Sequence, residues 1–271
     1  MKKIWMVGFL CLCQLSFASP MQDHKINPES LSQLASALDI PEGANILAET
    51  QKRWLRKPGQ ERWHVVELSP EQKSFVLNWA IEQGLYKSWK PLESKYDKAF
   101  ILGATTSRME KRLKYLKELW EEGIRFSEVV WLTGDRPLDK QVDGLFERCS
   151  NESEAAHLLW EEAALPKEMR KLSVVFSATP MKKEGTVLRR PNTADTIQEW
   201  LKTTSKPCKL LFVSDQPFCG YQFAVIKGCL PDSFPFDVVG KGLDPTSSSG
   251  SGAVILDTVA RWIYQENLNN K

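Results

Sequence analysis

Several short apolar runs in the chain are each followed by a polar segment that could carry chemistry. Small, charged and hydrogen-bonding residues at such positions are typical of the edge of a parallel sheet, where ligands meet the strand ends. Guanidinium groups suit a phosphate or carboxylate ligand, and glycine lets backbone N–H groups approach it. The segments span residues 103–108, 133–137, 189–196 and 214–217.

Anion binding is the chemistry that these segments indicate most directly. A helix cap needs no guanidinium, so the strand-end arginines would suit a phosphate or carboxylate ligand; they are Arg108, Arg136, Arg189 and Arg190. Arg112 lies one turn further along its helix and is expected on a solvated face. The residues expected to bind the ligand are Gly103, Thr105, Thr106, Arg108, Gly134, Arg136, Arg190, Asn192, Thr193, Ser214 and Gln216.

Carboxylates in the same segments are candidates for proton transfer. Asp135 and Asp215 follow two of the apolar runs, and we predict that one of them accepts a proton if a reaction occurs. Together with Asp195 they could also converge on magnesium, but no Asp-x-Asp pair is present to set that geometry. No Cys-x-x-Cys or histidine at zinc-ligand spacing is present either, so we expect no metal site.

Helix capping is the competing interpretation of the polar segments. Asn151 with Glu154, and Asn192 with Asp195, have the spacing of capping boxes. The loop at Gly103 lacks the further glycines of a dinucleotide fingerprint. Capping and ligand binding both remain open from these residues alone.

The apolar runs themselves predict the fold that positions these segments. They are nearly continuous, as expected for strands covered on both faces, and they alternate with helical patterns. The clearest helix has Met109, Leu113, Leu116 and Trp120 on one face, with Ser107 and Glu110 as a capping box and Gly123 at its end. This predicts a Rossmann-like, doubly wound α/β domain over residues 95–271, with a mainly parallel sheet of about five strands. The runs are residues 99–102, 129–132, 174–176, 210–213 and 236–239.

Residues 19–94 have a different pattern, which predicts a helical appendage. Pro28 begins one helical stripe, and Ser69 followed by Pro70 reads as an N-cap with proline at the first helical position. Gly84 suits the end of that second helix.

The first residues of the chain predict export. Lys2 and Lys3 precede an apolar run, and Ser16 and Ala18 place small residues at the two positions that signal peptidase reads. Together they indicate a signal peptide over residues 1–18 that is cleaved after Ala18. The run is too short for a permanent membrane anchor. We therefore expect a periplasmic or secreted protein.

Composition limits the partners. The formal net charge of +2 and the lack of a basic stripe argue against nucleic-acid binding. An oxidising compartment permits disulfides, and the pairing is left open among the four cysteines beyond residue 18, which are Cys149, Cys208, Cys219 and Cys229.

The order of the strand-end motifs resembles the YdcF-like (SanA/ElyC-type) family of bacterial proteins. The resemblance covers residues 97 to about 242. Its motifs are Leu102-Gly103 with Arg108 and Arg112, Thr133-Gly134-Asp135, Ser153-Glu154-Ala155, Asn192-Thr193 and Val213-Ser214-Asp215.

The resemblance implies a Rossmann-like fold, a link to the cell envelope and, for some members, a ligand such as S-adenosylmethionine; the family has no generally established reaction. It adds Glu154 to the expected ligand contacts. The residues after Ser214 depart from the family pattern and leave Tyr221 and Gln222 as a polar pair, of which Gln222 is also taken as a contact.

Three functions follow from these observations, with the cofactor left open. The first is an exported envelope protein that binds an anionic, phosphate-bearing or nucleotide-like small molecule, with or without a reaction. The second is a non-catalytic scaffold whose residues 19–94 bind a partner protein, and the third is a secreted effector. Convergence of Arg136, Asn192, Asp215 and Gln222 on one cleft would favour the first.

Overall fold

The computed structural model describes residues 25–56, 67–145, 147–204, 206–244, 247 and 250–271. The expected signal peptide and its cleavage after Ala18 lie outside the described residues. No described helix combines the length and apolar character needed to cross a membrane.

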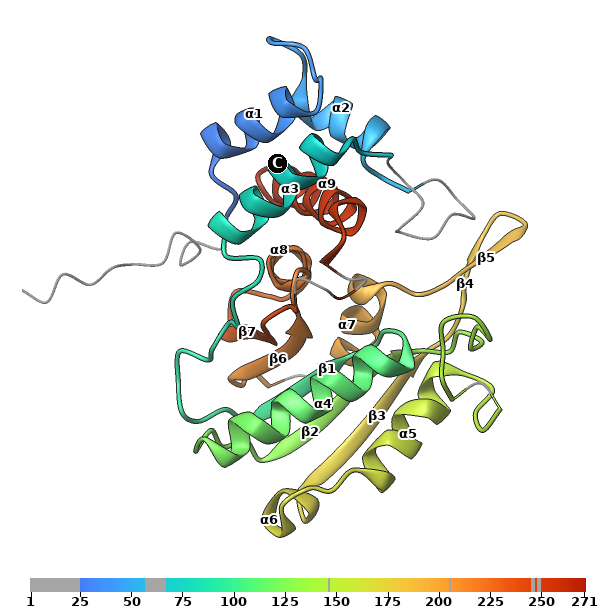
Figure 1. Cartoon of the computed structure of the whole chain (residues 1–271). Helices are drawn as coiled ribbons and strands as arrows, with labels where there is room; N and C mark the ends of the chain where they lie inside the picture. Colours follow the sequence, from blue (N-terminus) through green and yellow to red (C-terminus); the bar gives the residue numbers. More distant parts are fainter. Residues whose placement is uncertain (1–24, 57–66, 146, 205, 245–246, 248–249) are drawn as a thin grey trace, which may run out of the picture.

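The centre of the molecule is a five-stranded, all-parallel sheet in the order β3-β2-β1-β6-β7 (Figure 1). The chain runs outward from β1 to β3 and returns to the other side of β1, so the strand order reverses between β1 and β6. The predicted doubly wound α/β fold is confirmed, and each expected apolar run is a strand. The strands are β1 Lys98–Leu102, β2 Glu128–Gly134, β3 Ser173–Thr179, β6 Leu210–Asp215 and β7 Phe236–Lys241.

Helices cover both faces of this sheet. On one face α4 and α5 bury an apolar cluster that includes Met109, Leu113 and Leu116, as their helical spacing predicts. On the other face α7 and α8 pack over the sheet, and α9 packs against the outer side of α8. The short α6 follows α5. The helices are α4 Thr106–Glu121, α5 Glu152–Glu162, α6 Lys167–Arg170, α7 Thr193–Leu201, α8 Cys219–Cys229 and α9 Gly252–Asn269.

The start of α4 differs from the prediction. Its N-cap is Thr105, whose side chain makes no capping hydrogen bond, so the expected capping box of Ser107 and Glu110 is wrong. The physical reason is tertiary: the backbone N–H of Thr106 donates to the carboxylate of Asp143, at 3.0 Å, from a distant loop. A positive φ at Gly123 follows the end of the helix, as predicted.

The N-terminal helices share a hydrophobic core with the α/β domain. Trp79 and Val76 of α3 are buried in the same cluster as Val259 and Trp262 of α9. The Trp79 indole N–H also donates to the carbonyl of Ser30, at 2.9 Å, which joins α3 to α1. In Figure 1 these helices lie around α9. Their bounds are α1 Pro28–Ala37, α2 Ile46–Arg53 and α3 Pro70–Glu82.

The Ser69 cap of α3 is confirmed as a full capping box with Gln72. A hairpin of β4 (Lys182–Glu184) and β5 (Val187–Arg189) was not expected from the sequence. All four cysteines of the described residues are free, and Cys219 and Cys229 stand at opposite ends of α8.

Candidate functional site

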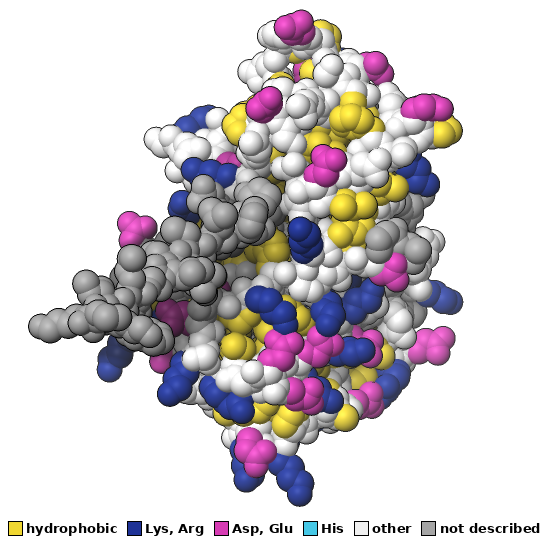
Figure 2. All heavy atoms as spheres, turned by 60° about the vertical axis from the view of Figure 1, so that its left-hand side comes forward, with side chains coloured by type: hydrophobic (Ala, Val, Ile, Leu, Met, Phe, Trp, Pro, Cys, Tyr) yellow, Lys and Arg dark blue, Asp and Glu magenta, His cyan; other side chains and the backbone are white. Residues whose placement is uncertain are grey.

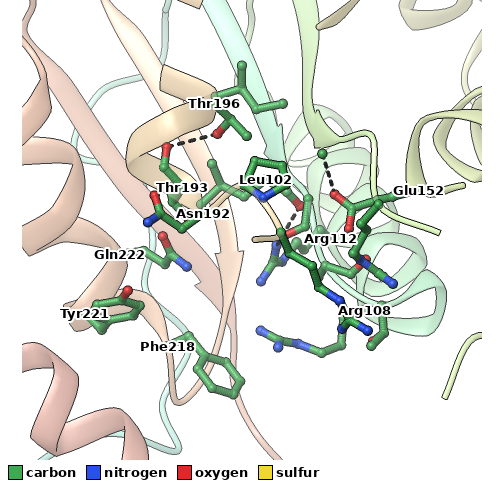
Figure 3. A pocket seen from close by; sticks show the side chains of 18 of the residues that line it. Leu102, Arg108, Arg112, Glu152, Asn192, Thr193, Thr196, Phe218, Tyr221 and Gln222 are labelled. Carbon is green, nitrogen blue, oxygen red and sulfur yellow. Dashed lines mark hydrogen bonds and ion pairs between the residues drawn. The ribbon is translucent and has the colours of Figure 1, made fainter. Parts of the chain in front are cut away.

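A cavity of about 560 Å³ lies beyond the carboxyl ends of β1 and β2 (Figure 3). Its floor includes Leu102, Gly103 and Gly134, and its walls come from α4, α7, α8 and α9. In doubly wound folds, ligands bind beyond the strand ends near the point where the strand order reverses. The cavity therefore occupies the position at which this fold places its ligands.

An ion cluster of α4 and β6 supports one side of the cavity. Both oxygens of the Asp215 carboxylate accept from Arg108, each at 2.9 Å, and Oδ1 also accepts from Arg112 at 2.7 Å. Arg112 donates further to the carbonyls of Leu102, at 2.6 Å, and Gly103, at 3.0 Å. Only 1% of Arg112 is exposed, so the expectation of a solvated face is wrong: its one-turn spacing from Arg108 brings it to the same carboxylate.

Asp215 is held ionised by these two arginines. Burial by itself raises its pKa, but the charges and hydrogen bonds of Arg108 and Arg112 outweigh burial and lower the pKa to about 2. A carboxylate with so low a pKa is a poor proton acceptor. Asp215 does not line the cavity, so its position suits it to holding the arginines.

A second buried ion cluster surrounds Arg136. Its guanidinium contacts Glu152 through Nε, Asp143 through Nη1 at 3.0 Å, and the carbonyl of Ala104 through Nη2 at 2.8 Å. Because Asp143 also accepts from the N–H of Thr106, this cluster ties the loop after β2 to the start of α4. Arg136 and Glu152 line the cavity, while Asp143 lies behind them.

Glu152 is the carboxylate that lines the cavity among the described residues. Its Oε1 accepts from the backbone N–H of Gly134, at 2.9 Å, and only 5% of the residue is exposed. Burial raises the pKa of Glu152, against the opposing charge of Arg136. Gly103 must be glycine here, because a Cβ would lie 2.2 Å from Glu152 Oε1.

Positive charge exceeds negative charge around the cavity. Seven cations line the cavity, whereas Glu152 is the one carboxylate among its described lining residues. Three further carboxylates, Asp143, Asp215 and Asp257, lie behind the wall and pair with some of these cations. Lys111 and Arg190 make no ion pair within the described part of the chain. By contrast, charges of both signs are mixed on the face in Figure 2. The cations are Arg56, Arg108, Lys111, Arg112, Arg136, Arg190 and Arg261.

The residues at the start of α7 both cap that helix and form part of the cavity wall. Asn192 and Asp195 form the predicted capping box, and Arg189 donates to Asp195 at 2.7 Å. Asp195 is thereby committed to the helix start. Asp135 is exposed and its N–H donates to the carbonyl of Thr179, so the three aspartates of the sequence prediction do not converge.

The wall made by α8 carries neutral groups. Phe218, Tyr221 and Gln222 line the cavity, and the guanidinium of Arg108 lies 3.9 Å from the Phe218 ring centroid. Gln222 is 9% exposed, and its Oε1 has no hydrogen-bond partner among the described residues. Tyr221 is partly buried beside Arg261.

Most of the predicted ligand contacts line this one cavity. They are Gly103, Thr105, Arg108, Gly134, Arg136, Arg190, Asn192, Thr193 and Gln222.

Other predicted residues lie elsewhere. Ser214 is buried in β6, Gln216 donates to the carbonyl of Lys87, and the Thr106 hydroxyl accepts from Gly144. Glu154 is exposed and accepts from Ser150 beside the N-terminus of α5. Asp135 and Asp215, the predicted proton acceptors, also lie outside the lining.

Sequence reasoning missed Glu152, Asp143 and Lys111. Glu152 directly follows the N-cap Asn151, where an acidic residue is common in the first turn of any helix, so its type and position do not distinguish it, although its side chain points back to the end of β2. Asp143 lies in an irregular loop, where no periodicity marks it. Lys111 had a usable signal, since it follows Arg108 by three residues and so shares its side of α4.

The fold and the cavity define a Rossmann-like α/β protein with a cationic cavity at the strand ends. Comparison with family models, curated proteins and solved structures found no match. No group of three or more histidine, cysteine, aspartate or glutamate side chains within the described ranges is placed to hold a metal ion.

Proposed function

We propose that this protein binds an anionic, phosphate-bearing small molecule in the cavity at the strand ends. The observation that carries the proposal is a cavity of about 560 Å³ lined by seven cations and one carboxylate, in which Lys111 and Arg190 have no ion pair among the described residues. A structural network of ion pairs needs only as many cations as carboxylates. Lys111 and Arg190, without an ion pair among the described residues, are available to a ligand.

The buried clusters prepare the cavity for an anion. Asp215 fixes Arg108 and Arg112, and Asp143 fixes Arg136, so the guanidinium groups are oriented before any ligand arrives. Such preorganisation reduces the entropy lost on binding. Planar guanidinium groups match the paired oxygens of a phosphate.

Binding of inorganic phosphate and pyrophosphate, measured by isothermal titration calorimetry, tests the proposal. We expect binding that weakens with added salt, and a clear loss of affinity in the double variant Lys111→Gln, Arg190→Gln. Both side chains are exposed, so the variant should keep the stability of the parent. A matched double variant, Lys140→Gln with Lys171→Gln, removes two exposed cations outside the cavity lining and should bind like the parent.

Absence of binding by both anions, or equal loss in the two double variants, would overturn the proposal. The alternative scaffold function, with a partner protein on residues 19–94, would then be favoured.

We also propose that the chain is related to the YdcF-like family and that it is exported. The strand-end motifs that resemble the YdcF-like family include Gly103, Arg108 and Asn192, and these residues line one cavity. Export is proposed on the first eighteen residues. N-terminal sequencing of the protein recovered from periplasmic and culture fractions tests it, with Ser19 as the expected first residue.

A further inference from the structure

The two sides of the cavity differ in chemistry. The side formed by α4 and the end of β2 is charged, with Arg108, Arg112 and Glu152 among its residues. The side chains that α7 and α8 themselves contribute to the opposite side are uncharged, although Arg190 precedes α7 and Arg261 of α9 lies beside Tyr221. Figure 3 shows these groups on opposite sides of the space. The neutral side consists of Asn192, Thr193, Thr196, Phe218, Tyr221 and Gln222.

The size of the cavity suits a ligand with an organic body. Cavities of about 300–1,000 Å³ hold organic ligands of moderate size, and this one measures about 560 Å³. An inorganic oxyanion on the arginines would leave the neutral side without contact. The part of the ligand that reaches the neutral side is therefore uncharged.

Gln222 indicates which chemistry the uncharged part carries. Its side chain is buried, and its Oε1 lacks a hydrogen-bond partner among the described residues. A buried amide without partners is unfavourable, so a ligand that pairs with it gains affinity. A primary amide offers a donor beside an acceptor, and its best complement is another N–H beside a C=O.

Asn192 and Tyr221 extend the neutral side. The Oδ1 of Asn192 accepts from the N–H of Asp195, which leaves its amide N–H groups for a ligand acceptor. Tyr221 lines the cavity next to Gln222 and offers an aromatic surface to a flat group.

We propose that the ligand is a phosphate ester whose uncharged body carries an amide edge, an N–H beside a C=O, that pairs with Gln222. This inference rests on the proposed function and adds the class of ligand. The phosphate lies on the cations that line the cavity, with Lys111 and Arg190 among them, and the amide edge lies on α8. The same chemistry occurs in two sources, the lactam edge of a nucleobase and the acetamido group of an N-acetylated amino-sugar phosphate.

Two matched pairs of ligands test this inference by calorimetry on the full chain. Uridine 5′-monophosphate is compared with ribose 5-phosphate, and N-acetylglucosamine 1-phosphate with glucose 1-phosphate. We expect the amide-bearing member of at least one pair to bind about tenfold more tightly, as one or two added hydrogen bonds allow. The pair that shows the difference identifies the source.

The variant Gln222→Met tests the contact itself. It keeps the length of the side chain and should abolish the preference for the amide-bearing ester while preserving phosphate binding. Gln198→Met, on the exposed side of α7, is the matched control and should keep the preference. If Gln222→Met does not fold, the comparison of ligands on the parent chain still decides the question.

Equal affinities within both pairs, or a preference that survives Gln222→Met, would overturn this inference. If all the esters and inorganic phosphate bind alike, the proposed anion site stands and only the amide contact fails. If neither the esters nor inorganic phosphate bind, the proposed function fails as well.

Discussion

The two edges of the sheet both carry ion pairs, but in different surroundings. At the amino edge, Lys98 of β1 pairs with Glu128 of β2, and about a quarter of each side chain remains exposed. At the carboxyl edge, Arg112 pairs with Asp215, and these side chains are 1% and 11% exposed. If the first pair separates, water can hydrate both charged groups, whereas the Arg112 guanidinium of the second pair has almost no access to water.

This difference indicates that the buried ion pairs at the carboxyl edge serve function, because their contribution to stability does not explain them. Buried ion pairs are weak contributors to stability, because desolvation offsets their attraction. Two such clusters nevertheless meet at one cavity, where both Arg108 and Arg136 line the wall. Their concentration at the edge where this fold binds ligands supports the assignment of the cavity as the functional site.

Loss of Arg112 should have the largest effect on stability and therefore tests most directly whether the two edges of the sheet differ. Arg112→Met would leave Asp215 buried with Arg108 as its remaining charged partner and would leave the carbonyl of Leu102 without its donor. We expect the free energy of unfolding to fall by about 3–5 kcal/mol. Urea denaturation measures it, and a loss below about 1 kcal/mol would show that the two edges do not differ in this way.

Acid should affect the carboxyl edge at very low pH. The pKa of Asp215 in the folded protein, about 2, lies below that of an unfolded aspartate, about 3.9. Its contribution is therefore complete above the unfolded value and is lost as pH falls through the folded value. We expect about 2–3 kcal/mol of stability to disappear between about pH 4 and pH 2.

Unfolding of the parent and of Asp215→Asn, compared across this range, isolates that contribution. The difference in unfolding free energy between the two chains should shrink as the pH falls. A difference that stays constant with pH would contradict the low pKa.

Glu152 tests whether the carboxyl edge binds anions, because its negative charge repels an anion in the cavity. Glu152→Gln keeps an oxygen that can accept from the Gly134 N–H and removes the negative charge. We expect sulfate to bind about tenfold more tightly, a gain of about 1.4 kcal/mol. Calorimetry on parent and variant measures this.

The same pair of chains should differ in pH dependence. The pKa of Glu152 is raised by burial, so protonation near that pKa removes its charge, and sulfate affinity of the parent should increase as pH falls through it. The variant should lack this increase. Identical pH profiles would place Glu152 outside electrostatic contact with the ligand.

The smallest effect is expected at the amino edge. Lys98→Met breaks the pair with Glu128, which solvent screens, and should cost less than about 1 kcal/mol. Urea denaturation beside Arg112→Met makes the two edges directly comparable. A cost as large as that of Arg112→Met would remove the distinction drawn between them.

The sequence by itself determined the sheet and most of the helices. The strands are continuous apolar runs such as residues 129–132, and Met109, Leu113 and Leu116 repeat at helical spacing, so local pattern and burial agree. Gly103 and Arg108 could be placed at the site because parallel strands end at a common edge.

Only the tertiary structure decided which polar residues share the cavity. Glu152 and Glu154 are two residues apart and chemically identical, yet one lines the cavity and the other is exposed beside the start of α5. Arg112 is buried because Asp215, more than a hundred residues away, supplies its countercharge. Local periodicity carries no information about such distant partners, since charge pairing depends on which segments the completed fold brings within a few ångströms of each other.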